Sequence, residues 1–167
     1  FIYSIANFPV MRCLEQIRND ICYHNANVVV VSVGGSFSYG SQGYTHHGLE
    51  DLGVMRSMSN MTVIAPADPF ETRLLTRQLI GRPGPAYLRL GKSGEPILVD
   101  NPKNIAEIGQ IRAIREGTDV MVLGIGSMVG NSLEAAKKLE AHDISVAVAS
   151  VHSLAPLDID FIQRAFA

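Results

Sequence analysis

The sequence has few cysteines, no cluster of basic residues and no long apolar run, and each absence excludes a class of protein. Its 167 residues include two cysteines, Cys13 and Cys22, which are too few for a disulfide framework and are expected to be buried free thiols. The 14 basic and 16 acidic residues are interspersed and leave a net charge of −2, which argues against a nucleic-acid-binding stripe. No signal peptide or membrane span is predicted, because no long apolar run follows the apolar residues 1–5. We therefore expect a cytoplasmic protein with no nucleic-acid or membrane partner.

Apolar residues make up 47% of the chain, enough for a packed core, and their spacing alternates between strand and helix patterns. Runs rich in strand-forming residues at 28–33, 61–65 and 85–90 predict buried strands of a parallel sheet. Between them, apolar residues at helical spacing predict helices over 9–21 and 49–58. The first half of the chain is therefore expected to be an α/β unit.

A further helix is predicted from its start and stop signals. Asp68 is a suitable N-cap, Pro69 suits the first helical position, and Glu71 completes a capping box. The helix is expected to run to about residue 80 and to stop at the Gly- and Pro-rich residues 81–84.

The character of the chain changes after residue 91, where Gly, Ser, Pro, Asp and Asn mark a linker with a short apolar insert, 97–99. A second unit follows, with strands predicted at 119–123 and 144–149 and a helix at 131–141. A last helix begins at 156–158. The alternation implies two α/β units with parallel sheets, and both chain ends fall inside apolar patterns, so we expect flanking sequence.

The most informative segment is Thr45-His46-His47-Gly48-Leu49-Glu50-Asp51, which we place at the start of the helix over 49–58. A loop rich in Gly, Ser and aromatic residues, 34–44, precedes it. Glycines let a backbone approach a ligand closely, and a histidine at the end of such a loop can carry a proton near neutral pH. This segment resembles the pyrimidine-binding domain of transketolases and of 1-deoxyxylulose-5-phosphate synthases, which are thiamine-diphosphate enzymes.

The resemblance covers nearly the whole chain and implies its domain organisation. Residues 1–91 are similar to the latter part of a parallel-sheet pyrimidine-binding domain, and residues 92–105 are the linker. Residues 106–167 are similar to the first half of the transketolase C-terminal domain. The expected activity is transfer of a two-carbon ketol unit between a ketose and an aldose.

The resemblance also assigns roles to individual residues. Tyr3 and Phe8 fall where the family has aromatic side chains against the aminopyrimidine ring of the cofactor. His46 matches the catalytic histidine that contacts substrate hydroxyls and shuttles a proton. Arg89 matches an arginine that binds the sugar phosphate, and Lys92 is expected to be a solvated linker residue.

Several residues near His46 differ from the family pattern or have a simpler explanation. Gly34 and Gly35 replace a basic residue that many members have at the start of the loop. Gln42 replaces an aspartate three residues before the threonine, which changes the contact to a substrate hydroxyl. His47 is expected to be non-catalytic. Residues 50–51 place two carboxylates in the first helical turn, where they complement the helix dipole.

Two parts of the family's machinery are not found in this sequence. The resemblance implies a glutamate upstream of the aromatic residues and a Gly-Asp-Gly…Asn motif that holds diphosphate and Mg²⁺. We therefore expect thiamine diphosphate and Mg²⁺ to be held mainly by a diphosphate-binding transketolase domain or subunit. A homodimer or heterotetramer, with the active site between protomers, is implied.

Alternatives from inside and outside the family remain open. The chain resembles 1-deoxyxylulose-5-phosphate synthase and the β subunit of 2-oxoacid dehydrogenase E1 in architecture. The glycine-rich residues 124–130 follow a strand and open a helix, a loose dinucleotide-binding pattern without the acidic residue that would bind a ribose. A non-catalytic assembly module is a further alternative. A metal site is not predicted, because Cys13, Cys22 and His24 lack ligand spacing.

Overall fold

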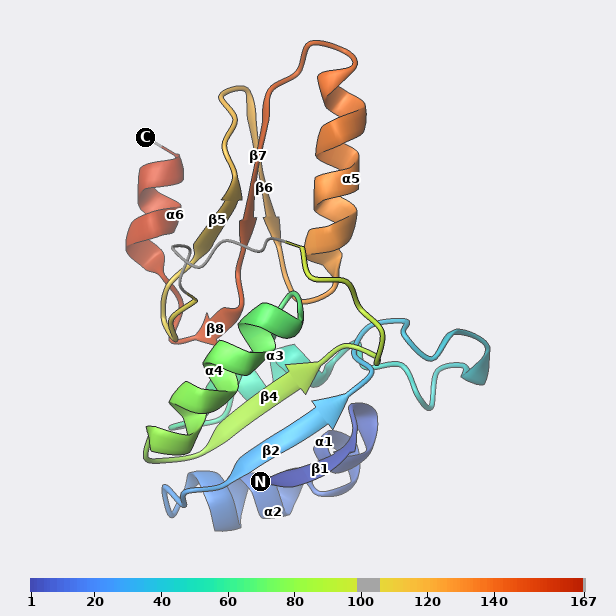
Figure 1. The fold of residues 1–167 in the computed structure, drawn as a ribbon. Coiled ribbons are helices and arrows are strands. Elements are labelled where there is room, and N and C mark those ends of the chain that lie inside the picture. Colours follow the sequence, from blue (N-terminus) through green and yellow to red (C-terminus); the bar gives the residue numbers. More distant parts are fainter. Residues whose placement is uncertain (99–105, 167) are drawn as a thin grey trace.

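The computed structural model describes residues 1–98 and 106–166, in which eight strands form two sheets (Figure 1). The first sheet is built from most of the first half of the chain and one strand of the second half, and the second sheet is built from the second half alone. The strand order of the first sheet is β1 (Ile2–Ile5), β2 (Val29–Val33), β4 (Ala86–Leu90), β3 (Thr62–Ile64) and β8 (Ser153–Ala155).

The four strands from the first half are parallel, so their carboxyl ends lie at one edge of the sheet. The predictions at 28–33, 61–65 and 85–90 are confirmed as β2, β3 and β4. The predicted parallel sheet is confirmed for these strands, and β8 adds an edge strand that pairs with β3 in the antiparallel direction. The short strands β1 and β8, at the two edges of this sheet, were not predicted.

Helices cover both faces of this sheet, and the side chains of the strands alternate between the two. Val30 packs with the helices of one face, whereas Val29 and Val31 pack toward the other. In Figure 1, α4 lies over one face, and α1, α2 and α3 lie across the other. The helices are α1 (Asn7–Arg12), α2 (Leu14–Gln16), the π-helix η1 (Ile17–Cys22), α3 (Asp51–Arg56) and α4 (Pro69–Gly81).

Two helix predictions need correction. The continuous helix over 9–21 is wrong: the stretch starts at Asn7 and is interrupted at Cys13, whose φ of −116° and ψ of 24° leave the helical region. The three-turn helix over 49–58 is reduced to the six residues of α3. The sequence period was correct in both cases, but apolar spacing does not detect a local interruption.

Cys13 is exposed rather than buried, so the prediction of two buried thiols is wrong for this residue, while Cys22 is buried in the core. Burial raises the pKa of the Cys22 thiol, which lowers its thiolate fraction. Treatment of the native protein with iodoacetamide near pH 8 should therefore alkylate Cys13 and spare Cys22. Peptide mass mapping measures both sites, and equal labelling under native conditions would contradict the burial of Cys22.

The predicted cap of α4 is confirmed, although one of its residues has another partner. The Asp68 carboxylate accepts a hydrogen bond from the Glu71 backbone N–H at 2.8 Å, and Pro69 occupies the first helical position. The Glu71 carboxylate does not return to the N-cap residue, as a capping box would require. It accepts a hydrogen bond from the Ala67 backbone N–H at 2.7 Å and is fully buried.

The second sheet consists of β5 (Arg112–Arg115), β7 (Val146–Ser150) and β6 (Val120–Gly124), in that order. β6 and β7 are the two predicted parallel strands, whereas β5 is antiparallel to β7 and was not predicted. Helices α5 (Met128–Glu140) and α6 (Ile159–Ala165) pack against opposite faces. No helix among the described residues is long and apolar enough to cross a membrane.

A buried polar cluster joins the two sheets around Glu71. Its carboxylate forms an ion pair with Arg112 of β5 at 3.2 Å. It also accepts a hydrogen bond from the Ser150 hydroxyl of β7 at 3.0 Å, and the ring of His152 lies 3.8 Å away. Since Glu71 belongs to α4, one carboxylate holds both parts of the molecule together.

Candidate active site

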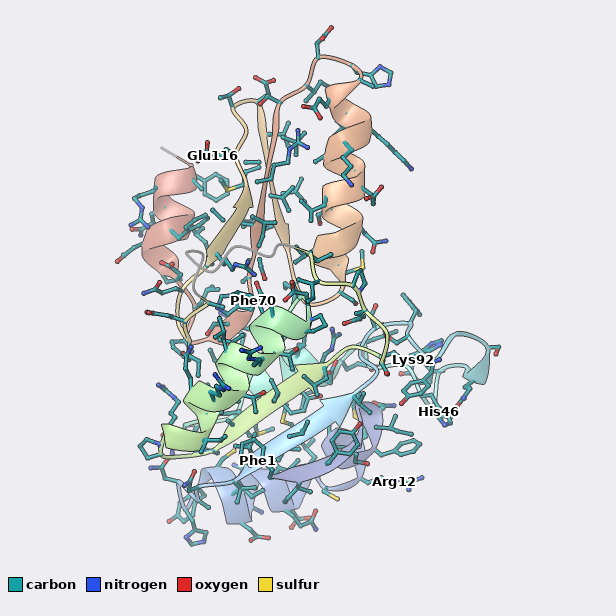
Figure 2. The ribbon with its side chains drawn as sticks, in the orientation of Figure 1. Phe1, Arg12, His46, Phe70, Lys92 and Glu116 are labelled. Carbon is teal, nitrogen blue, oxygen red and sulfur yellow. The ribbon has the colours of Figure 1, made fainter. Side chains whose placement is uncertain are left out.

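The loops that follow β1, β2 and β4 meet at the carboxyl edge of the first sheet, the edge at which α/β proteins bind ligands. The segment 34–50 extends from this edge, and its described turns include the 3-10 helix η2 (Gly40–Gln42). Figure 2 shows His46 on this extension with Lys92 close to it. The predicted site residues can be located relative to this edge.

His46 lies in a turn and not at the start of a helix, because its backbone N–H bonds to the Gly43 carbonyl and α3 begins only at Asp51. Its Nδ1 lies 3.0 Å from the Thr45 hydroxyl. Phe8 and Tyr39 each present a ring to the imidazole, with centroid separations of 5.3 Å and 5.8 Å. No hydrogen bond within the described residues engages Nε2, so this nitrogen has no protein partner there.

The structure brings Phe8 to His46 across 38 residues of sequence. Phe8 also lines an apolar cavity of about 240 Å³, together with Asn7, Tyr44 and Thr45. The Asn7 side-chain oxygen is buried and has no hydrogen-bond partner among the described residues, a state that costs free energy unless a ligand or water supplies a donor. Sequence reasoning missed Asn7, and its position beside an assigned aromatic residue was the available signal.

Tyr3 lies apart from Phe8 and His46. It is 68% exposed on the edge strand β1 and lines a different cavity of about 280 Å³, which it shares with Lys92 and Glu95. Burial raises the pKa of Glu95, while the charge of Arg89 lowers it. The two aromatic residues predicted to share the cofactor ring therefore line different cavities, and the assignment of Tyr3 stays a prediction.

Arg89 is buried beneath the loop and its contacts are with the protein. Its Nη2 donates to the Gly48 carbonyl at 3.2 Å, and its Nε lies 3.4 Å from the Asp51 carboxylate. The Tyr87 hydroxyl donates to the same carboxylate at 2.7 Å, and burial followed by the Asp51 charge raises the Tyr87 pKa. Asp51 is thus fully buried, and the expectation that it only complements a helix dipole is wrong. The phosphate-binding role of Arg89 stays a prediction.

Gly35 is required for this arrangement, because a Cβ at this position would lie 1.9 Å from Arg89 Nε. The variant Gly35→Ala is expected to lose about 1–3 kcal/mol of unfolding free energy, through overpacking against a buried guanidinium. Gly53→Ala is the matched control, since its Cβ would meet no atom within 4 Å inside α3 and alanine favours a helix by roughly 0.5–1 kcal/mol. Urea titration measures both, and equal stability of the two variants would contradict the close packing at Gly35.

The other residues singled out in this loop have exposed positions or local partners. Gln42 is exposed in η2. His47 lies 3.0 Å from the Gly40 carbonyl through Nε2, and its ring meets Phe37. The Tyr44 hydroxyl donates to the Glu50 carboxylate at 2.6 Å, a contact that lowers the Glu50 pKa. These contacts hold the loop, and they leave His46 Nε2 facing no protein partner within the described residues.

The residues present fit one end of thiamine diphosphate. The Phe8 ring and the unsatisfied acceptor of Asn7 suit an amino-substituted aromatic ring, and the Arg12 guanidinium also lies over the Phe8 ring, 4.8 Å from its centroid. No group of three His, Cys, Asp or Glu side chains within the described ranges is placed to hold a metal ion. The fit found here is therefore limited to an aromatic ring that carries an amino group.

Family comparison agrees with the division of the chain into two parts. Residues 3–95 match the model of the transketolase pyrimidine-binding domain, and residues 109–167 match that of the transketolase C-terminal domain. The pyrimidine-binding match alone covers more than half of the chain.

Individual relatives are similar over almost the whole chain. One subunit of the apulose-4-phosphate transketolase of Phocaeicola vulgatus is 32% identical over 99% of this chain and 53% of its own length. The 1-deoxy-D-xylulose-5-phosphate synthase of Pelotomaculum thermopropionicum is 34% identical over 98% of this chain and 26% of its own length. A split-gene transketolase, solved as an inactive β4 tetramer, superposes with a TM-score of 0.86 at 36% identity, over 97% of this chain and 52% of that one. The chain thus spans about half the length of the relatives that are single subunits.

Proposed function

This chain belongs to the transketolase family, and from that premise we propose that it forms the pyrimidine-side face of an active site for ketol transfer. The reaction moves a two-carbon ketol unit from a ketose to an aldose and depends on thiamine diphosphate. The observation that supports this most strongly is the packing of His46 against Phe8, beside the unsatisfied oxygen of Asn7. A catalytic imidazole and a cofactor-binding surface are thereby adjacent.

Phe8 and Asn7 bind and orient the cofactor in this proposal. When bound, thiamine diphosphate supplies the carbanion that cleaves and forms the carbon–carbon bond. The face of the Phe8 ring buries the aminopyrimidine, and the Asn7 oxygen accepts a hydrogen bond from its amino group. Tyr3 lines a different cavity, and its contact with the cofactor is proposed from the family resemblance alone.

His46 moves the proton that the substrate gains or loses. Its Nδ1 lies 3.0 Å from the Thr45 hydroxyl, which restrains the ring, while Nε2 has no hydrogen-bond partner among the described residues. A neutral imidazole can accept a proton from a substrate hydroxyl and return it to a carbonyl oxygen. Gln42 is proposed to contact a second hydroxyl through its amide, and Arg89 to support the loop or bind a substrate phosphate.

The partner is proposed to be a diphosphate-binding transketolase subunit or domain, which also holds Mg²⁺. The acidic ligands that a hard cation requires are not grouped in the described part of this chain. A relative that matches most of this chain is itself one subunit of a transketolase, and a split-gene relative forms a tetramer. A homodimer or heterotetramer follows as the proposed assembly, working on small sugar substrates in the cytoplasm.

A synthase-like activity is the second candidate, because a 1-deoxy-D-xylulose-5-phosphate synthase matches the chain at 34% identity. The dinucleotide alternative has less support. The space beside the glycines of the 124–130 loop is filled by packing: a Cβ at Gly124 would lie 2.9 Å from Val129, and one at Gly126 would lie 3.3 Å from Arg89.

The test is a ketol-transfer assay on the full-length protein together with its diphosphate-binding partner. Apulose 4-phosphate and xylulose 5-phosphate serve as ketose donors, glyceraldehyde 3-phosphate as the aldose acceptor, and pyruvate as the competing synthase donor. Ketose-dependent product that requires added thiamine diphosphate and Mg²⁺ supports the proposal. If pyruvate is the only donor that gives product with this acceptor, the synthase is supported. If no donor gives cofactor-dependent product, both candidate functions are contradicted.

A further inference from the structure

The ring of Tyr39 occupies the space that a side chain at Gly34 would fill. A Cβ at Gly34 would lie 2.1 Å from Tyr39 Cε2, and Gly34 has a φ of +81°, which favours glycine. The phenol ring can therefore lie directly against the backbone where β2 ends, at the edge of the sheet that carries the proposed site. Because Gly34 has no side chain, the ring of Tyr39 from the same loop can occupy this space.

Tyr39 contacts the groups around which the proposed site is built. Its ring centroid lies 5.8 Å from that of His46, and the Lys92 ammonium lies over the ring at 5.9 Å. Lys92 follows β4, so the ring spans the loops after two neighbouring strands. These contacts fix the body of the side chain between an imidazole and a cation.

The polar ends of these three side chains lack partners within the protein. In the described ranges, no hydrogen bond or ion pair engages the Tyr39 hydroxyl, the Lys92 ammonium or Nε2 of His46. A phenol hydroxyl can donate one hydrogen bond and accept others, so it suits an alcohol or a carbonyl of a substrate. Tyr39 is half-buried, and its hydroxyl is not among the buried polar atoms that lack a partner.

We propose that Tyr39 is a specificity-determining residue whose hydroxyl hydrogen-bonds an alcohol or carbonyl oxygen of the sugar substrate beside His46. This inference rests on the proposed ketol transfer. Its consequence is selection for substrates that carry an oxygen at the position facing Tyr39. A site built to bond a hydroxyl discriminates against analogues that lack it, because its own polar group is then left unpaired.

The experiment compares Tyr39→Phe with wild type in the full-length protein and its partner, with apulose 4-phosphate as donor. Phenylalanine keeps the ring against Gly34 and removes only the hydroxyl, so loss of fold is not expected. We expect kcat/KM to fall by about tenfold, the effect of losing one hydrogen bond to an uncharged group. Tyr23→Phe is the matched control, since Tyr23 is 80% exposed outside the site, and it should leave kcat/KM unchanged.

The variant His46→Ala separates failure of this inference from failure of the proposed function. If His46→Ala impairs turnover while Tyr39→Phe stays within twofold of wild type, Tyr39 only packs the loop and the inference is overturned. If neither substitution changes turnover, the proposed site itself is wrong and the inference falls with it. A loss in Tyr39→Phe that also appears in Tyr23→Phe would equally overturn a specific contact.

Discussion

Replacing His46 with alanine should lower kcat for ketol transfer by about 10²- to 10⁴-fold, the usual contribution of a positioned acid–base group. His46 is held by Thr45 and by two aromatic rings, and its Nε2 has no protein partner within the described residues. Steady-state kinetics of the full-length protein with its partner and saturating thiamine diphosphate measures the effect.

The adjacent histidine provides the control for this prediction. His47 Nε2 lies 3.0 Å from the Gly40 carbonyl and its ring meets the Phe37 ring, so we expect this residue to hold the loop. His47→Ala should retain turnover within a few-fold of wild type. Equal turnover in His46→Ala and wild type would show that His46 is a structural residue.

Replacing Glu71 with alanine should destabilise the protein by about 3–5 kcal/mol, the cost of breaking a buried ion pair by removing one partner. The substitution leaves Arg112, a residue that is 3% exposed, without the counter-charge of its guanidinium. It also removes the acceptor for the Ser150 hydroxyl and for the Ala67 backbone N–H. Urea-induced unfolding of the full-length protein, followed by circular dichroism, gives the change in free energy.

Glu134→Ala is the matched control for the stability measurement. Its ion pair with Lys137 is within one helix and both side chains are about two-thirds exposed, so no measurable change in the unfolding midpoint is expected. The Glu71 and Glu134 carboxylates thus form ion pairs of similar length, the first in the buried interior and the second on the exposed surface. A Glu71→Ala protein as stable as the control would contradict the role of Glu71 in joining the two sheets.

Local signals predicted much of the fold. The cap at Asp68 depends on neighbouring residues, and the buried strands β2 and β3 are runs of apolar residues, so each is visible in a short window of sequence. Glu71 shows the limit of this reasoning. Its spacing from Asp68 fits a capping box, but its carboxylate is used by residues 41 and 79 positions away. A pairing over that distance leaves no periodic trace.

In the proposed site, too, the residues marked by a local sequence pattern were predicted, and those whose role depends on distant contacts were not. His46 and Phe8 were selected because their surroundings resemble a family pattern, and the fold brings their rings to 5.3 Å. Asn7 and Tyr39 were not selected, since their significance depends on an unsatisfied buried oxygen and on the space above Gly34. Arg89 was selected as a strand-end cation, but its burial with Asp51 depends on a contact between β4 and α3.

The most direct test of the proposed function is a crystal structure of the full-length protein, assembled with its diphosphate-binding partner and thiamine diphosphate. The proposal predicts the aminopyrimidine against the Phe8 ring, the Asn7 oxygen at its amino group, and His46 Nε2 facing the reactive side of the cofactor. The diphosphate and Mg²⁺ should contact the partner subunit or domain. A cofactor bound without contact to Phe8 and Asn7, or remote from His46, would contradict the proposed active site.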